Sequence, residues 1–311
     1  MSKRKTRPYI EPKEMAYEDF PESKLSASGM KVIQADYSLP YCQVQKIQYA
    51  VKSGMPLHLN VIKPVQDDGS FEKFPLILYV QGSAWLPQNL ESKLVQLGKF
   101  SERGFVVGIV EYRPSTVAPF PAQVKDAKTA YRYLVKHANN YNINPEQVVI
   151  WGDSSGGHTA SMVGLTHTDS EFDDECPKAF PIEVKAVIDY YGPTDISKMN
   201  EEPSTCDHQK PDSPEGLLIG GLDVLDNHQL AQKANPINYI KKSRAIPPFI
   251  IFHGSKDRLV PFGQSIMLFN ALKKAKKDVE FYKIKGADHG QAPFWSPTVI
   301  ELVEKFIRKN I

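Results

Sequence analysis

The chain has 311 residues, of which 41% are hydrophobic and 10% are aromatic. Its 38 basic and 36 acidic side chains nearly cancel, which leaves a formal net charge of +2. This balance argues against a disordered chain, which combines low hydrophobicity with strong net charge. It also argues against a nucleic acid as the main partner, because such a partner calls for a basic surface. One hydrophobic core can organise a chain of this length.

The N-terminus begins with the basic sequence MSKRKTR, and no apolar stretch follows it. It therefore lacks the pattern of a secretory signal, and no run approaches the roughly 18 apolar residues of a transmembrane helix. We expect a cytoplasmic protein with no membrane partner. The three cysteines, Cys42, Cys176 and Cys206, form no CxxC pair, and we expect no metal and no cofactor. Residues 1–40 are interpreted as an N-terminal extension and 41–311 as one domain.

Eight strand-like segments follow the extension. The first two, 43–51 and 57–65, alternate polar and apolar residues as half-exposed strands do. Six continuous apolar runs, typical of parallel strands buried on both faces, come next at 75–80, 105–110, 147–151, 184–191, 248–253 and 279–284. Helical spacing of apolar residues occurs at 122–138, 265–277 and 296–309. The alternation predicts an α/β fold with a doubly wound, mostly parallel eight-stranded sheet that begins with an antiparallel pair.

Residues 196–243 interrupt this alternation. They contain no buried strand, and they include the polar, proline-bearing stretch EEPSTCDHQKPDSPEG. A long irregular segment inside a compact domain is usually either functional or disordered. Because the flanking strands should carry chemistry at their ends, we interpret residues 196–243 as a small cap or lid.

The segment VVIWGDSSGGHTASMVGL, residues 148–165, carries the chemistry. An apolar strand ends at Trp151, Gly-Asp-Ser-Ser-Gly follows, and a helix of small residues begins, which is the G-x-S-x-G nucleophile elbow in its strand–turn–helix context. Side chains at Gly152 and Gly156 would collide where strand and helix approach each other. The start of the helix also directs backbone N–H groups toward a developing oxyanion. We predict that Ser154 is the nucleophile, and a structural glycine-rich turn is the alternative.

A serine hydroxyl needs a base beside it, and the chain order for this elbow is serine, then acid, then histidine. His289, in KGADHGQAP after the last strand, fits the base, whereas His253 at a strand end is interpreted as a packed imidazole. Asp257, in FHGSKDRLVP, fits the acid that orients the base. Asp195 is its rival, and Asp288 lies too close to His289 in sequence to reach the ring. The predicted triad is therefore Ser154, His289 and Asp257.

Several segments together resemble the carboxylesterase and lipase branch of the α/β-hydrolase superfamily. They are most similar to the bacterial acetyl-xylan and feruloyl esterases, over roughly residues 43–310. The segments are YVQGSAW, EYRPS, PFPAQVKDAKTAYRYLVKHANNYNINPEQVVIWGDSSGGH, AVIDYYGPTD, PPFIIFHGSKDRLVP and GADHG. The resemblance implies an α/β-hydrolase fold and the same three triad residues. It also implies a serine carboxylesterase that hydrolyses short-chain acyl esters, such as acetyl or feruloyl groups on saccharides.

The oxyanion loop departs from the pattern of these relatives, which carry His-Gly-Gly-x-Trp after the third strand. Here the stretch is Gln-Gly-Ser-Ala-Trp, from Gln81 to Trp85. Because the donors are main-chain N–H groups, a serine can serve unless its position needs a positive φ, which would strain it. The comparison assigns the donors to Ser83, Ala84 and Ser155.

The substrate is the least defined part of the prediction. Trp85 and Trp295 are candidates for an aromatic wall, and packing residues are the alternative. We expect a small-molecule ester as the partner, such as an acylated oligosaccharide. A serine aminopeptidase or an aryl-formamide hydrolase would use the same triad, and a non-catalytic hydrolase-fold binding protein is a further alternative.

Overall fold

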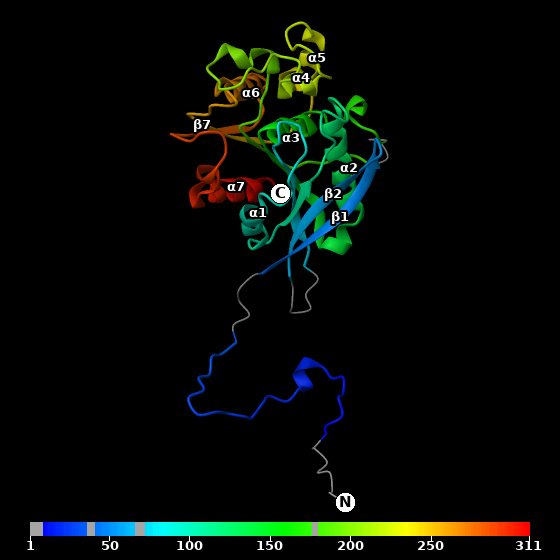
Figure 1. Cartoon of the computed structure of the whole chain (residues 1–311), viewed down its shortest axis with the longest axis vertical. Coiled ribbons are helices and arrows are strands. Elements are labelled where there is room, and N and C mark those ends of the chain that lie inside the picture. The colour runs from blue at the N-terminus through cyan, green and yellow to red at the C-terminus, as the bar shows by residue number, and fades with distance from the viewer. Residues whose placement is uncertain (1–8, 36–40, 66–71, 176–179) are drawn as a thin grey trace, which may run out of the picture. The chain divides into compact units, whose positions relative to one another are not determined.

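The computed structural model describes residues 9–35, 41–65, 72–175 and 180–311. The chain divides into two compact units, Met1–Leu39 and Pro40–Ile311, both drawn in Figure 1. In the first unit every described residue is exposed, and the 3-10 helix η1 covers Tyr17–Asp19. Cys176 lies outside the described residues, and Cys42 and Cys206 are free thiols.

The second unit is built on one eight-stranded sheet. Its strands are β1 Cys42–Lys52, β2 Met55–Pro64, β3 Phe74–Val80, β4 Val106–Val110, β5 Ile143–Asp153, β6 Val187–Tyr190, β7 Phe249–Gly254 and β8 Val279–Ile284. Their order in the sheet is β1-β2-β4-β3-β5-β6-β7-β8. Strand β2 pairs antiparallel with both β1 and β4, and the other neighbours are parallel. The predicted mostly parallel sheet with its antiparallel start is confirmed.

Helices cover both faces of this sheet (Figure 1). They are α1 Leu94–Ser101, α2 Ala122–Lys136, α3 Ser155–Leu165, α4 Pro214–Leu218, α5 His228–Lys233, α6 Gly263–Lys274 and α7 Pro297–Asn310. The three predicted helical segments correspond to α2, α6 and α7, each beginning within two residues of its predicted start. Helix α1 has no counterpart among the predictions. In the described part of the chain, no helix combines the length and the apolar character needed to cross a membrane.

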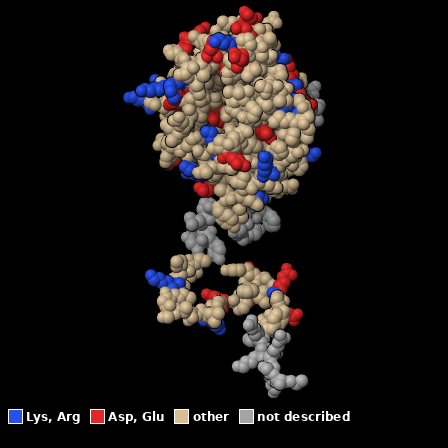
Figure 2. Space-filling model, viewed as in Figure 1, with Lys and Arg blue, Asp and Glu red and all other residues tan. Residues whose placement is uncertain are grey.

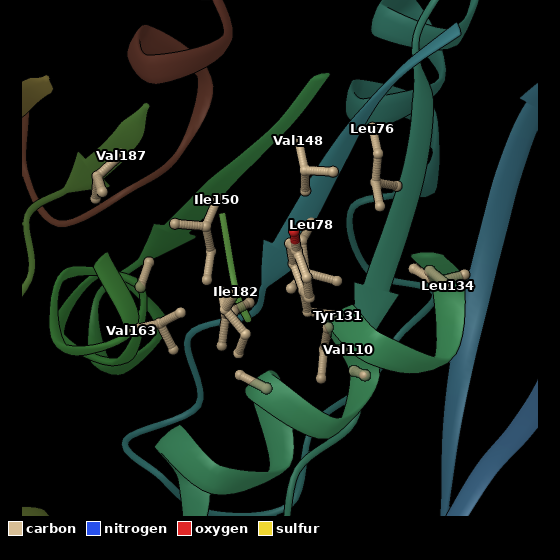
Figure 3. Packing of buried hydrophobic residues seen from close by; sticks show 14 of the residues in the cluster. Leu76, Leu78, Val110, Tyr131, Leu134, Val148, Ile150, Val163, Ile182 and Val187 are labelled. Carbon is tan, nitrogen blue, oxygen red and sulfur yellow. The ribbon is translucent and has the colours of Figure 1, made fainter. Parts of the chain in front are cut away.

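The two sides of the sheet bury separate apolar clusters because successive side chains on a strand point to opposite faces. On β3, Leu76 and Leu78 pack with α2 and α3 on one face, and this cluster is drawn in Figure 3. Ile77 and Tyr79 pack with α1 and α7 on the other face. A sheet buried on both faces explains why six strands read as continuous apolar runs. The rigid sheet also fixes the carboxyl ends of β5, β7 and β8, from which the predicted triad residues extend.

The insertion, residues 196–243, contains the 3-10 helices η4 Ile196–Glu201 and η5 Pro236–Tyr239 together with α4 and α5, and it contains no strand. Its apolar side chains form a small cluster with Trp85 and Val260, to which Leu218 and Val224 contribute. The insertion is also hydrogen-bonded to the loop after β7, where the Thr205 N–H donates to the Arg258 carbonyl at 2.8 Å. Its role as a cap stays a prediction.

Charged side chains of both signs are interspersed over the face of the molecule shown in Figure 2. This mixture agrees with the formal net charge of +2. No single-sign field covers that face.

Candidate active site

Ser154 lies between the end of β5 and the first residue of α3. Its φ of 52° and ψ of −127° place it outside the regions that non-glycine residues favour, at a cost of about 1–3 kcal/mol. The Ser154 N–H donates to the Tyr190 carbonyl at 2.8 Å, and its own carbonyl accepts from the His158 N–H at 3.1 Å. The side chain is half-buried. These bonds hold the turn in the conformation that presents the hydroxyl above the sheet edge.

The two glycines of the elbow allow the strand and the helix to approach closely. A Cβ atom on Gly152 would collide with the Gly156 carbonyl, and one on Gly156 would collide with the Val80 carbonyl. Backbone atoms cannot move aside as the end of a flexible side chain can. The structure therefore agrees with the prediction that side chains at Gly152 and Gly156 would collide where the strand and the helix approach each other.

The three residues predicted as a triad lie within hydrogen-bonding distance of one another. His289 Nε2 is 2.9 Å from Ser154 Oγ, and His289 Nδ1 is 2.8 Å from Asp257 Oδ2. Because an ionised carboxylate only accepts, Nδ1 donates to Asp257, and Nε2 is left to accept the serine proton. His289 lies in the loop after β8 and Asp257 in the loop after β7. The arrangement can activate a hydroxyl as a nucleophile.

The Asp257 carboxylate is fully enclosed and accepts bonds at both oxygens. Oδ1 accepts from the N–H groups of Leu259 and Val260, each at 2.9 Å. Oδ2 is shared by His289 and by His253, whose Nε2 is 3.1 Å away. Burial alone would raise the pKa of Asp257, but the hydrogen bonds from His253 and His289 outweigh it and hold the pKa well below its usual range. The acid therefore stays ionised beside the base.

The two rival acids are engaged elsewhere. Asp195 accepts from the Ser197 N–H and hydroxyl at the start of η4. Asp288 forms an ion pair with Arg258 at 2.6 Å. Asp288 also accepts from the His289 backbone N–H at 2.8 Å, but of the three carboxylates that we considered only Asp257 contacts the His289 ring.

The oxyanion loop differs from its prediction at one residue. The Ser83 N–H donates to Ser155 Oγ at 2.9 Å, so this donor is already engaged and we correct its assignment. The amides of Ala84 and Ser155 have no acceptor within the ranges that the structure describes. The positive φ values fall on Ala84, at 57°, and Trp85, at 54°, so the serine at position 83 is not strained in the way that we considered.

Asp153 fastens the oxyanion loop to the elbow, a role that the sequence analysis missed. Its Oδ1 accepts from the Gly82 N–H at 2.8 Å and from the Tyr79 hydroxyl at 2.7 Å. Its Oδ2 lies 3.4 Å from the Tyr191 hydroxyl. Asp153 occupies the variable second position of G-x-S-x-G, so the motif itself carries no signal for this contact. An acidic residue at the end of a buried strand was the only available indication.

The two tryptophans proposed as a substrate wall are mainly packing residues. Trp85 is 1% exposed and contacts the His158 ring edge-to-face at 5.2 Å. Trp295 is 7% exposed and stacks on Trp151 at 5.3 Å. Trp295 lines a surface pocket of about 350 Å³ together with Gln291. The packing alternative therefore describes Trp85 fully and Trp295 for most of its surface.

Residues 59–272 match the model of the BD-FAE family. The chain belongs to the BD-FAE family. It is 27% identical to Esterase LipC of Mycobacterium tuberculosis over 223 residues, which are 70% of this chain and 53% of LipC. The chain spans about half the length of the curated relatives that it matches.

Two solved structures place this BD-FAE member among proteins of the α/β-hydrolase fold. A truncated carbohydrate esterase from gut microbiota superposes with a TM-score of 0.74 at 26% identity, over 89% of this chain and 99% of that one. A bifunctional GH43-CE protein of Bacteroides eggerthii gives a TM-score of 0.72 at 29% identity, over 87% of this chain and 38% of that one. The predicted resemblance to α/β-hydrolase esterases is confirmed. In the residues that the structure describes, no cluster of three or more His, Cys, Asp or Glu side chains could hold a metal.

Proposed function

We propose that this protein is a serine carboxylesterase that hydrolyses short-chain acyl esters. The observation that carries the proposal is the unbroken hydrogen-bonded series from Ser154 through His289 to Asp257, placed at a strained elbow. The names of the relatives support it, because LipC is an esterase and the gut protein is a carbohydrate esterase.

In the proposed reaction, Ser154 Oγ attacks the ester carbonyl carbon while His289 Nε2 takes the hydroxyl proton. The resulting oxyanion accepts hydrogen bonds from the N–H groups of Ala84 and Ser155, which have no other acceptor in the described chain. The C–O bond to the alcohol then breaks, and His289 returns the proton to the departing oxygen. Water, deprotonated by His289, then attacks the acyl carbon, the C–O bond to Ser154 breaks, and His289 returns the proton to Ser154 Oγ as the acid leaves. Asp257 stabilises the imidazolium in both halves of the reaction.

We further propose that the acyl group is acetyl or feruloyl and that the alcohol belongs to a saccharide. The support is the pair of solved relatives, one described as a carbohydrate esterase and the other as a GH43-CE protein. Substrate preference in this fold depends on the loops at the carboxyl end of the sheet. The insertion, residues 196–243, is the largest of these loops.

Turnover of p-nitrophenyl acetate tests the chemistry. Ser154→Ala should lower kcat by about three powers of ten or more while the protein stays folded, and a fluorophosphonate probe should label the wild type only. Ser101→Ala is the matched control, because this serine is buried in α1, outside the predicted triad and the oxyanion loop, and should leave turnover unchanged. Near-normal hydrolysis by the Ser154 variant would overturn the proposal.

A parallel panel tests the substrate. Acetylated and feruloylated oligosaccharides should be cleaved faster than aminoacyl anilides and N-formyl aromatic amines. Preference for an anilide or a formamide would replace the saccharide assignment while it kept the serine mechanism. Heat-inactivated protein and the Ser154 variant serve as controls in every arm.

A further inference from the structure

His253 is a buried residue near the end of β7 that does not reach Ser154. Its Nε2 lies 3.0 Å from the Val260 carbonyl and 3.1 Å from Asp257 Oδ2, and its Nδ1 lies 2.7 Å from Ser265 Oγ. The carbonyl and the carboxylate are both acceptors, so Nε2 must carry a proton. The Nδ1 atom of the neutral imidazole then accepts a hydrogen bond from the Ser265 hydroxyl. Ser265, on α6, therefore supports, by a hydrogen bond to Nδ1, the tautomer that donates toward the acid.

We propose that His253 is a positioning residue that holds the Asp257 carboxylate where it can accept the hydrogen bond from His289 Nδ1. The inference rests on the proposed function, since it assigns a role within the same reaction. The two imidazoles converge on one oxygen of Asp257, at 2.8 Å and 3.1 Å. The other oxygen is fixed by two backbone N–H groups. With the backbone and His253 both bound, the carboxylate cannot rotate away from His289.

The donor also affects the charge that His289 meets. The N–H of His253 draws electron density from Asp257 Oδ2, so the carboxylate attracts the proton of His289 less strongly. Without this donor the carboxylate attracts the proton on His289 more strongly. The titratable groups facing His253 from neighbouring elements include Asp189 on β6 and Tyr191 just beyond it, whose ring is 6.5 Å from that of His253. On β8, Lys283 is the sheet partner of His253, and its ammonium lies over the Phe262 ring that contacts His253. Asp288 is already paired with Arg258.

Two substitutions distinguish a role for His253 as a hydrogen-bond donor to Asp257 from a role in which its ring only fills space. His253→Leu fills the site but removes the donor, whereas His253→Gln keeps an N–H that can reach the carboxylate. His137→Leu, at the end of α2, is the matched control, because its half-buried ring contacts the Tyr133 carbonyl and ring on an element that carries no residue of the predicted triad. Ser265→Ala tests the tautomer without altering the imidazole.

Two measurements are made on each variant. The first is kcat/KM for p-nitrophenyl acetate against pH, and the second is the ¹H NMR signal of the proton between His289 and Asp257 in a Ser154→Ala background. The NMR signal needs no turnover. If the wild type hydrolyses no ester, the proposed function fails, and the signal still tests the role of His253.

For His253→Leu we expect kcat/KM to fall by about 10-fold or more. We also expect the acid limb, the rising part of the profile of kcat/KM against pH, to move to higher pH by up to about one unit. His253→Gln should recover most of the rate, and Ser265→Ala should shift the limb in the same direction by less. The NMR signal should move or broaden in His253→Leu and stay in place in the His137 control. A lower melting temperature with an unmoved pH limb and an unchanged NMR signal would overturn the proposal. If His253→Leu does not fold, an unchanged profile and signal in Ser265→Ala would do so.

Discussion

Asp153→Ala should damage both the stability of the protein and the oxyanion loop. In the wild type one carboxylate oxygen accepts from the Gly82 N–H and the Tyr79 hydroxyl. Alanine leaves both donors without an acceptor, and each orphaned buried donor costs about 1–3 kcal/mol. The two together lower the free energy of unfolding by about 2–6 kcal/mol, a large share of the roughly 5–15 kcal/mol typical of a domain. Because Gly82 precedes the Ala84 donor by two residues, kcat should also fall by about 10-fold or more.

Asp153→Asn is the matched control for this prediction. Its amide oxygen can still accept from Gly82 and Tyr79, so the loss of unfolding free energy should stay near about 1 kcal/mol. Urea unfolding followed by circular dichroism gives the stability, and initial rates on p-nitrophenyl acetate give kcat. The reasoning is refuted if the alanine variant unfolds within about 0.5 kcal/mol of the wild type, or if the asparagine variant loses as much as alanine.

Three further predictions concern packing, a buried ion pair and pH. Gly156→Ala should prevent folding, or cost about 3 kcal/mol or more in urea unfolding, because the new Cβ meets the backbone of β3. Gly98→Ala in α1 is the control. Its Cβ meets open space, so it should be neutral or stabilising by up to about 1 kcal/mol in the same assay. Asp173→Ala should cost about 3 kcal/mol, measured in the same way, because the Arg132 guanidinium, which is 4% exposed, loses its partner at 2.7 Å and keeps the more exposed Glu175 carboxylate at 3.7 Å. A loss below about 1 kcal/mol would contradict this. Burial would lower the pKa of His208, but the ion pair with Glu215, at 3.1 Å, outweighs burial and raises it. The stabilisation that this pair gives the folded protein is therefore complete below the ordinary pKa of about 6.5. It is lost as pH rises through the raised pKa. The difference in melting temperature between the wild type and His208→Leu should therefore shrink from pH 5.5 to pH 9, and a constant difference would count against the pair.

The sheet and the grouping of Ser154, Asp257 and His289 were predictable because their signals are local. Strands buried on both faces read as apolar runs, and the order of Ser154, Asp257 and His289 follows from the positions of the strand ends. Helix α1 was missed because eight residues with a glycine in their interior give little periodicity. The short helices of the insertion are held by tertiary contacts with Trp85 rather than by their own spacing.

The finer parts of the site depended on contacts between distant segments. Whether the Ser83 N–H is free depends on the rotamer of Ser155, 72 residues away. The bond from His253 to Asp257 spans only four residues, but it forms because the loop after β7 turns back over the strand end. Residue type and spacing suggested that His253 is packed, and only the fold shows what it contacts.

The hydrogen bond from the Thr205 N–H to the Arg258 carbonyl matters for anyone who wishes to exchange the insertion between family members. Arg258 follows Asp257 directly in the chain, so the insertion contacts the loop that carries the predicted catalytic acid. A chimera with a foreign segment at 196–243 will keep this contact beside the acid only if the donor segment supplies an equivalent N–H there. Grafts should therefore be designed as pairs, with the loop at 257–263 transferred together with the insertion.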